Sequence, residues 1–278
     1  MVLIGGTSGN ALSSLTAIDQ WISTLNSSIA GSARTGYKNS QVTFGGGSTR
    51  MEKPVINGAL GIQYAEQALN IGSTNIDFSQ GQVVASTQFT HLALSGSQNA
   101  FFVYSDTANL AATNPPPKYY YSRDGETHQD INGNLVNADG LFLVGKDTNN
   151  NNQIVNIAIG SNSGPDLTAR IDAHNLGLPN GARLAHVTIN DLSSLKYSKY
   201  GGTVLQTDTP ATLAGTFGVA GAGASLNVRI TGSALEASNV QLPSTTVELS
   251  LAQKIYNALA KVIQVDQAKL DSIFNLIR

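Results

Sequence analysis

Residues 27–40 read SSIAGSARTGYKNS, a small and polar segment that ends an apolar repeat arriving from upstream. The repeat alternates steps of four and three residues, which is typical of a narrow helical seam rather than of the broad apolar face of a globular helix. Its members are Ala11, Leu15, Ile18, Ile22, Leu25 and Ile29. The sequence therefore predicts a helix that ends near Gly31, where glycine readily takes the left-handed conformation.

A second helix is predicted at the other end of the chain, starting after Pro243-Ser244 and running to about Arg278. Apolar residues recur there at mostly the same spacings, at Val247, Leu251, Ile255, Leu259, Val262, Leu270, Ile273 and Ile277. Between the two helices, short segments rich in β-branched and aromatic residues alternate with Gly, Asn, Asp and Pro, which is typical of strands and turns. Within this region, DINGN at 130–134 predicts a tight hairpin turn, and Asp191 predicts the cap of a single helical turn.

The predicted fold class is therefore α+β, with N- and C-terminal helices that form a coiled-coil inner domain and a mainly β body between them. A narrow seam buries its side chains best against another helix, either the other terminal helix or those of neighbouring copies. The predicted divisions are an N-terminal coiled-coil helix at 1–31, a joint and extended hairpin region at 32–75, the first part of the β body at 76–146, a second β segment at 147–234 and a C-terminal coiled-coil helix at 235–278.

Composition narrows the classes of function. Charged residues make up 12% of the chain, about half of the roughly 25% that is usual, and the net charge is −2. A surface this neutral repels its own copies weakly, which favours self-association, and it offers no electrostatic attraction for nucleic acid. The sequence contains no cysteine, so thiol nucleophiles, disulfides and cysteine metal sites are excluded.

The chain carries no sign of a membrane span or a secretory signal peptide. No apolar run approaches the roughly 18 residues that cross a bilayer. The first basic residue is Arg34, so the basic start of a signal peptide is missing. The sequence therefore predicts no membrane insertion and, if the protein is exported, export without a cleaved signal peptide.

No motif for catalysis, cofactor binding or metal binding stands out. The histidines at positions 91, 128, 174 and 186 are scattered and lack a second ligand at metal spacing. The segment that begins at Asp147 starts like a calcium loop but has Asn152 where the loop needs glycine. A nucleophile elbow, a phosphate-binding loop and a dinucleotide fingerprint are absent from the sequence. We therefore expect no catalytic residue, no cofactor and no metal.

Several longer motifs follow one another along the chain. SSIAGSARTGYKNSQVTF at 27–44 contains T-x-G-[YF]-K and a later Phe, and FSQGQVV at 78–84 contains F-x-Q-G. YYSRDGETHQDINGNLVNADGLFLVG at 120–145 contains Y-[ST]-R-x-G, LEASNVQL at 235–242 contains L-E-x-S-N-V, and AQKIYNALAKVIQ at 252–264 contains A-Q-[RK]-x-Y. In these motifs and their order, the chain resembles the bacterial flagellar rod and hook family, the axial proteins of the basal body.

This resemblance implies a structural subunit and not an enzyme. It implies a protein that polymerises helically into an extracellular rod or hook-like filament of the bacterial flagellum. The implied partners are copies of itself, neighbouring axial proteins and a type III-like export apparatus. The implied location is extracellular or in the cell envelope. Two alternatives remain at this point: a subunit of a flagellum-related non-motile surface filament, and a β-domain carbohydrate-binding module or enzyme.

The residues expected at the subunit interface are those of the two apolar seams. They are Leu15, Ile18, Ile22, Leu25, Ile29, Leu251, Ile255, Leu259, Val262, Leu270, Ile273 and Ile277. The resemblance also places Thr35, Gly36, Tyr37 and Lys38 at a joint between the inner helix and the outer β body. Small residues would let the chain turn there, and Tyr37 and Lys38 are expected to contact a neighbouring copy.

Overall fold

The chain folds into two compact units in the computed structural model, which describes residues 6–47, 49–52, 63–66, 68–110, 116–147, 153–158, 182–209, 216–219 and 228–276. The first, called the terminal unit, comprises Met1–Ala30, Ser40–Asp77 and Gln241–Arg278. The second, called the β unit, comprises Gly31–Asn39 and Phe78–Val240. The chain therefore passes between the two units four times, and the short segment 31–39 belongs to the β unit although both of its flanks belong to the other.

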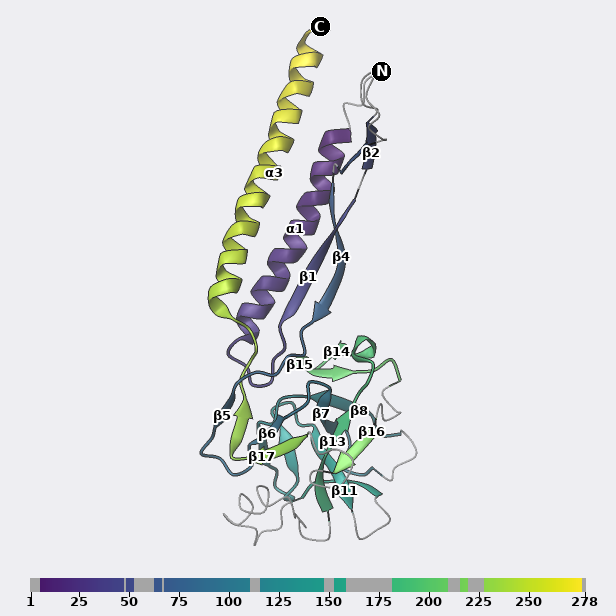
Figure 1. The fold of residues 1–278 in the computed structure, drawn as a ribbon, viewed down its shortest axis with the longest axis vertical. Helices are drawn as coiled ribbons and strands as arrows, with labels where there is room; N and C mark the ends of the chain where they lie inside the picture. The colour runs from purple at the N-terminus through teal and green to yellow at the C-terminus, as the bar shows by residue number, and fades with distance from the viewer. Residues whose placement is uncertain are drawn as a thin grey trace. The chain divides into compact units, whose positions relative to one another are not determined.

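The terminal unit combines two helices with β ribbons. Its elements are α1 (Gly6–Gly31), β1 (Ser40–Gly46), β2 (Thr49–Glu52), β3 (Gln63–Glu66), β4 (Leu69–Ile76) and α3 (Leu242–Leu276). Strand β1 pairs antiparallel with β4, from Ser40 opposite Ile76 to Gly46 opposite Leu69, and β2 pairs antiparallel with β3. Figure 1 shows the β1–β4 ribbon running alongside α1, with α3 on the other side of that helix.

The prediction that the terminal helices form a coiled-coil inner domain is wrong, although the α+β class agrees with the described residues. Helix α1 packs against a β ribbon as well as against α3, because its buried face is broad. That face includes small residues outside the predicted seam: Ser14 and Ala17 are 7% and 5% exposed. The Ser14 hydroxyl accepts a 2.9 Å hydrogen bond from the backbone N–H of Leu69 in β4, and Trp21 packs edge-to-face on Phe44 of β1. Small side chains allow this close approach, and a search for large apolar residues overlooks them.

Helix α1 ends at Gly31, as predicted, but the left-handed conformation expected there is absent. Gly31 does not take the left-handed conformation; Gly36 does, with φ +65°. A Cβ atom at Gly31 would overlap the ring of Tyr37, so this position requires glycine because the aromatic side chain packs directly on its Cα. At the start of α3, the carbonyl of Gln241 accepts bonds from the backbone N–H and the hydroxyl of Thr245.

The β unit is built on an antiparallel sheet of ten strands among the residues described. Its path is β14-β15-β8-β7-β13-β11-β10-β9, with β12 added beside β11 and β16 beside β13. These strands are β7 (Ala100–Ser105), β8 (Tyr119–Ser122), β9 (Thr127–Gln129), β10 (Leu135–Asn137), β11 (Phe142–Asp147), β12 (Gln153–Asn156), β13 (Ala182–Thr188), β14 (Lys196–Ser198), β15 (Gly201–Gln206) and β16 (Thr216–Val219). Two small ribbons complete the unit, β6 (Leu92–Ser95) with β17 (Arg229–Gly232) and β5 (Val83–Ala85) with β18 (Ala234–Glu236).

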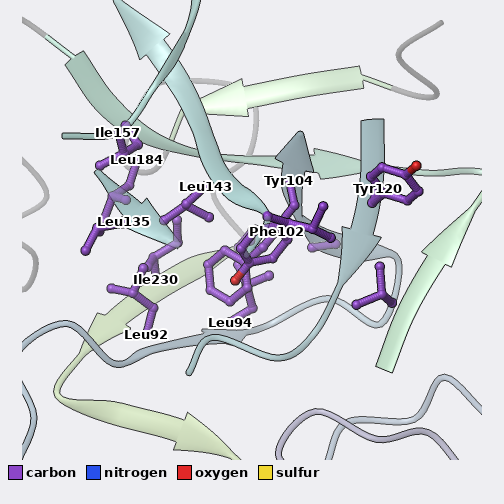
Figure 2. Packing of buried hydrophobic residues seen from close by; sticks show 14 residues of the cluster. Leu92, Leu94, Phe102, Tyr104, Tyr120, Leu135, Leu143, Ile157, Leu184 and Ile230 are labelled. Atoms are coloured by element: carbon purple, nitrogen blue, oxygen red, sulfur yellow. The ribbon is translucent and has the colours of Figure 1, made fainter. Parts of the chain in front are cut away.

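The core of the β unit lies between the large sheet and the β6–β17 ribbon. Leu92 and Leu94 of β6, Phe102 of β7, Leu143 of β11 and Ile230 of β17 are each at most 2% exposed and belong to one cluster. Figure 2 shows these side chains pointing toward one another from strands far apart in the sequence. Every residue of β7 is buried, so both faces of this strand are covered.

Two local predictions are confirmed. The DINGN segment forms the turn between β9 and β10, closed by a 2.9 Å bond from the Asp130 N–H to the Asn134 carbonyl. Asp191 caps the short 3-10 helix η2 (Leu192–Ser194) by accepting a 3.1 Å bond from the N–H of Ser193. In the described part of the chain, neither α1 nor α3 has a stretch both long and apolar enough to cross a bilayer.

His186 should make the stability of the β unit depend on pH. Its side chain on β13 is fully buried, and neither ring nitrogen has a hydrogen-bond partner among the described residues. Burial lowers the pKa of His186 from 6.5 to about 4. The unfolded chain therefore binds a proton between pH 6.5 and about 4 that the folded chain does not, so stability falls across this window as the pH falls.

We expect His186→Leu, which cannot titrate, to remove about 3 kcal/mol of this pH dependence. Urea unfolding of both proteins at neutral pH and at the acidic end of the window measures the change. Equal losses of stability in the wild type and the variant would contradict the prediction.

Candidate assembly surface and joint segment

The predicted interface residues of α1 lie inside the terminal unit. Ile18 and Leu25 are buried and form one cluster with Ala252 of α3. Ile22 packs against the same cluster. Leu15 and Ile29 are half-buried. The α1 seam is therefore largely used for packing within the chain.

The predicted interface residues of α3 divide between two faces of the helix. Ile255 and Leu259 pack against the Ile18 cluster. Leu251, Val262 and Ile273 are instead 50%, 46% and 42% exposed. Leu270 is half-buried, and Ile277 lies outside the described residues. A single apolar stripe was predicted on this helix, but the structure has a packed face and a second face in contact with water.

The second face carries a row that we call the α3 apolar stripe. Its members are Val247, Leu251, Ala258, Val262 and Val265, all exposed. Their spacings of 4, 7, 4 and 3 residues place them within about 60° of one another around a helix of 3.6 residues per turn. A hollow of about 380 Å³ lies at the start of the stripe, bordered by Val247, Leu251 and Lys254 among others.

Charged side chains of opposite sign border the stripe. At about 100° per residue, Lys254 and Lys261 project from one edge, and Glu248 and Asp266 from the other. Both lysines and Glu248 are exposed, whereas the Asp266 side chain is 14% exposed and lies 3.8 Å from Lys269. The surface of α3 thus has an apolar centre, a basic edge and an acidic edge.

The predicted joint is a docked segment rather than a free turn. We call residues 31–39 the strap, because this segment lies entirely within the β unit. The hydroxyl of Thr35 donates a 2.6 Å bond to Asp124 Oδ1, and the backbone N–H of Gly36 donates a 2.7 Å bond to the carbonyl of Glu236. Burial raises the pKa of Asp124, and the bond from Thr35 partly opposes that shift.

A buried ion cluster holds the C-terminal half of the strap. Lys38 Nζ lies 2.6 Å from Glu236 Oε1 and donates a second bond, of 2.7 Å, to the carbonyl of Ser79. Arg123 Nη1 lies 3.3 Å from Glu236 Oε2. The side chains of Lys38, Arg123 and Glu236 are only 4%, 1% and 0% exposed. One carboxylate therefore pairs with two cations in a site that excludes water.

Two backbone groups and an aromatic ring also contact the residues of the cluster. The backbone N–H of Gly81 donates a 2.9 Å bond to Glu236 Oε1. Arg123 Nη2 donates to the carbonyl of Ser97, and its guanidinium carbon lies 5.6 Å from the centre of the Phe101 ring. Burial lowers the pKa of Arg123, while the Glu236 carboxylate opposes that shift.

Four of the sequence motifs meet at this cluster. They contribute Thr35 to Lys38, then Ser79 and Gly81, then Arg123, and finally Glu236 and Asn239. Lys38 and Glu236 are 198 residues apart, so no local spacing pairs them. The sequence did contain one indication of this cluster: charged residues are scarce in the chain, and these charged residues lie within the ordered motifs.

The two joint residues that were expected to contact a neighbouring copy are buried, so their exposure does not support that contact. Tyr37 and Lys38 are each 3% exposed, and the contacts described above for Lys38 lie within its own chain. Contact with a neighbour stays a prediction for these two residues. Among the described residues, no group of three His, Cys, Asp or Glu side chains is arranged to hold a metal ion.

No family model matches the chain, and no curated protein matches its sequence. The resemblance to flagellar axial proteins therefore depends on the motifs themselves.

Proposed function

We propose that the chain is a structural subunit that associates with copies of itself into a helical filament of the cell surface or envelope, like the flagellar rod and hook proteins that its motifs resemble. The observation that carries this proposal is the α3 apolar stripe. A row of exposed apolar residues on a long helix favours association, because association removes that surface from water. The low charge of the chain adds to this tendency, since copies repel one another weakly.

The proposal assigns self-association to the α3 apolar stripe and not to α1. The apolar residues of α1 are occupied by packing against α3 and the β1–β4 ribbon, as the burial of Ile18 and Leu25 indicates. Of the interface residues expected from the sequence, Leu251 and Val262 therefore keep that role. Val247, Ala258 and Val265 join them because they share the same exposed face.

The charged edges of the stripe favour one orientation of neighbouring copies. When two α3 helices lie face to face and parallel, the edge with Lys254 and Lys261 of one copy meets the edge with Glu248 and Asp266 of the other. In the antiparallel arrangement, edges of like charge meet. Opposite charges beside an apolar contact select partner orientation in helix pairs, so we propose parallel association.

A pair of variants on one turn of α3 tests the proposal. Val262→Asp and Gln264→Asp add the same charge, but Val262 lies in the stripe and Gln264 is exposed on the opposite side of the helix. We expect Val262→Asp to raise the concentration needed for assembly at least tenfold, because an unpaired carboxylate at an apolar contact costs several kcal/mol. Sedimentation over a concentration series and negative-stain microscopy measure assembly, and circular dichroism checks the monomer fold.

Gln264→Asp serves as the matched control and should assemble like the wild type. Two results would overturn the proposal. One is a wild-type chain that stays monomeric at every concentration. The other is a Val262→Asp variant that forms the same particles as the wild type at the same concentration.

A further inference from the structure

The chain passes between its two units at four places. Residues beside three of these places are linked by one set of hydrogen bonds within the β unit. These passages follow Asn39, precede Phe78 and follow Val240. The N–H of Asn39 donates a 2.7 Å bond to Asn239 Oδ1. The side-chain amide of Asn239 donates to both the carbonyl and the hydroxyl of Ser79, at 3.2 and 3.0 Å. Residues beside all three passages are therefore tied to one another.

The Glu236 carboxylate is the anion that pairs with both buried cations at the site where these passages meet. Its two oxygens accept from Lys38, Arg123 and the N–H of Gly81. Without this carboxylate, docking of the strap would place the Lys38 ammonium beside the buried Arg123 guanidinium without the anion that pairs with both. Burying cations without a paired anion is strongly unfavourable. The strap and Glu236 are therefore energetically coupled.

We propose that the strap acts as a latch. It docks on the β unit only when β18 has placed Glu236 at this site, so docking of this N-terminal segment depends on the folding of the last strand of the β unit. Two bonds from the strap end on this residue: the Gly36 N–H donates to its backbone carbonyl, and Lys38 Nζ donates to its carboxylate. When the carboxylate is lost, residues 31–39 leave the β unit while its sheet remains folded. This latch does not depend on self-association and operates in the monomer.

Hydrogen exchange on a dilute monomer tests the latch. In Glu236→Gln, we expect a peptide covering 32–39 to exchange at least tenfold faster than in the wild type. A peptide covering β7, in the core of the large sheet, should exchange at the wild-type rate. Lys38→Met, which leaves one cation facing one carboxylate, should accelerate exchange of the strap less than Glu236→Gln does, because the remaining charges balance.

The matched control is Asp208→Asn, which removes the carboxylate of an exposed ion pair of the same length. Asp208 lies 2.6 Å from Lys196, and both side chains are more than half exposed. Such pairs contribute little, so exchange of the strap should not change. A strap that stays protected in Glu236→Gln overturns the proposal. So does equal acceleration of the strap and β7 in both Glu236→Gln and Lys38→Met, because the cluster would then support the whole unit rather than the strap.

Discussion

Replacing Ile18 by Asp is expected to unfold α1 and the helical part of the terminal unit. Ile18 is fully buried, in a cluster with Leu25 and Ala252. The side chains of that cluster are hydrophobic, so the new carboxylate would lose its water there. The cost is several kcal/mol, on the order of the whole stability of a small unit. Far-ultraviolet circular dichroism should show a large loss of helix, and hydrogen exchange should show the strands of the β unit still protected.

Leu12→Asp is the matched control for this prediction. Leu12 lies on the same helix and is 58% exposed, so the same substitution there adds a solvated charge. We expect its circular dichroism and its unfolding midpoint to match those of the wild type. A folded Ile18→Asp variant that has lost only self-association would contradict the assignment of α1 to the core of the terminal unit.

Replacing Gly36 by Ala is expected to destabilise the β unit by more than about 3 kcal/mol. Gly36 has φ +65°, a conformation that costs alanine about 1–2 kcal/mol. In addition, an added Cβ would overlap the backbone nitrogen of Asp124 and lie 2.5 Å from the carbonyl carbon of Arg123. Backbone atoms cannot rotate away, so the strap must shift, and the bond from the Gly36 N–H to Glu236 lengthens or breaks. Equilibrium urea unfolding measures the loss.

Gly140→Ala measures the destabilisation caused by the backbone conformation alone, without the contribution of close packing. Gly140 also has a positive φ, of +77°, but an added Cβ there would meet no atom within 4 Å. We expect Gly140→Ala to cost only the conformational part, about 1–2 kcal/mol. Equal losses at the two positions would show that close packing of the strap on Arg123 and Asp124 contributes nothing.

Features governed by a few neighbouring residues were predictable from the sequence. The DINGN turn between β9 and β10 and the cap at Asp191 each depend on local backbone geometry and short-range hydrogen bonds, and the end of α1 was predicted at Gly31. The α+β layout, with helices toward both ends and strands between them, follows from a change in apolar period along the chain. Even here, the left-handed conformation expected at Gly31 was wrong, and the packing of Tyr37 that requires glycine at this position is identified only by the fold.

The sequence did not reveal which side of each terminal helix would be covered. Helix α1 shows a narrow apolar repeat, yet Ser14 on its buried face bonds to Leu69, 55 residues away. The coiled-coil prediction failed because it counted large apolar residues and ignored the small ones that admit a β ribbon. On α3, one predicted stripe became two faces, since contact with α1 buries Ala252 and leaves Leu251 beside it exposed.

The sequence by itself determined the order of helices and strands and the scarcity of charge, because period, turn residues and composition act locally or as averages. Only the tertiary structure decided that the α1 repeat serves the core, that an apolar stripe of α3 stays in water, and that Glu236 pairs with both Lys38 and Arg123. The physical reason is that burial is a property of surfaces in contact. Which side chains lose their water depends on segments that meet across as many as 200 residues of chain.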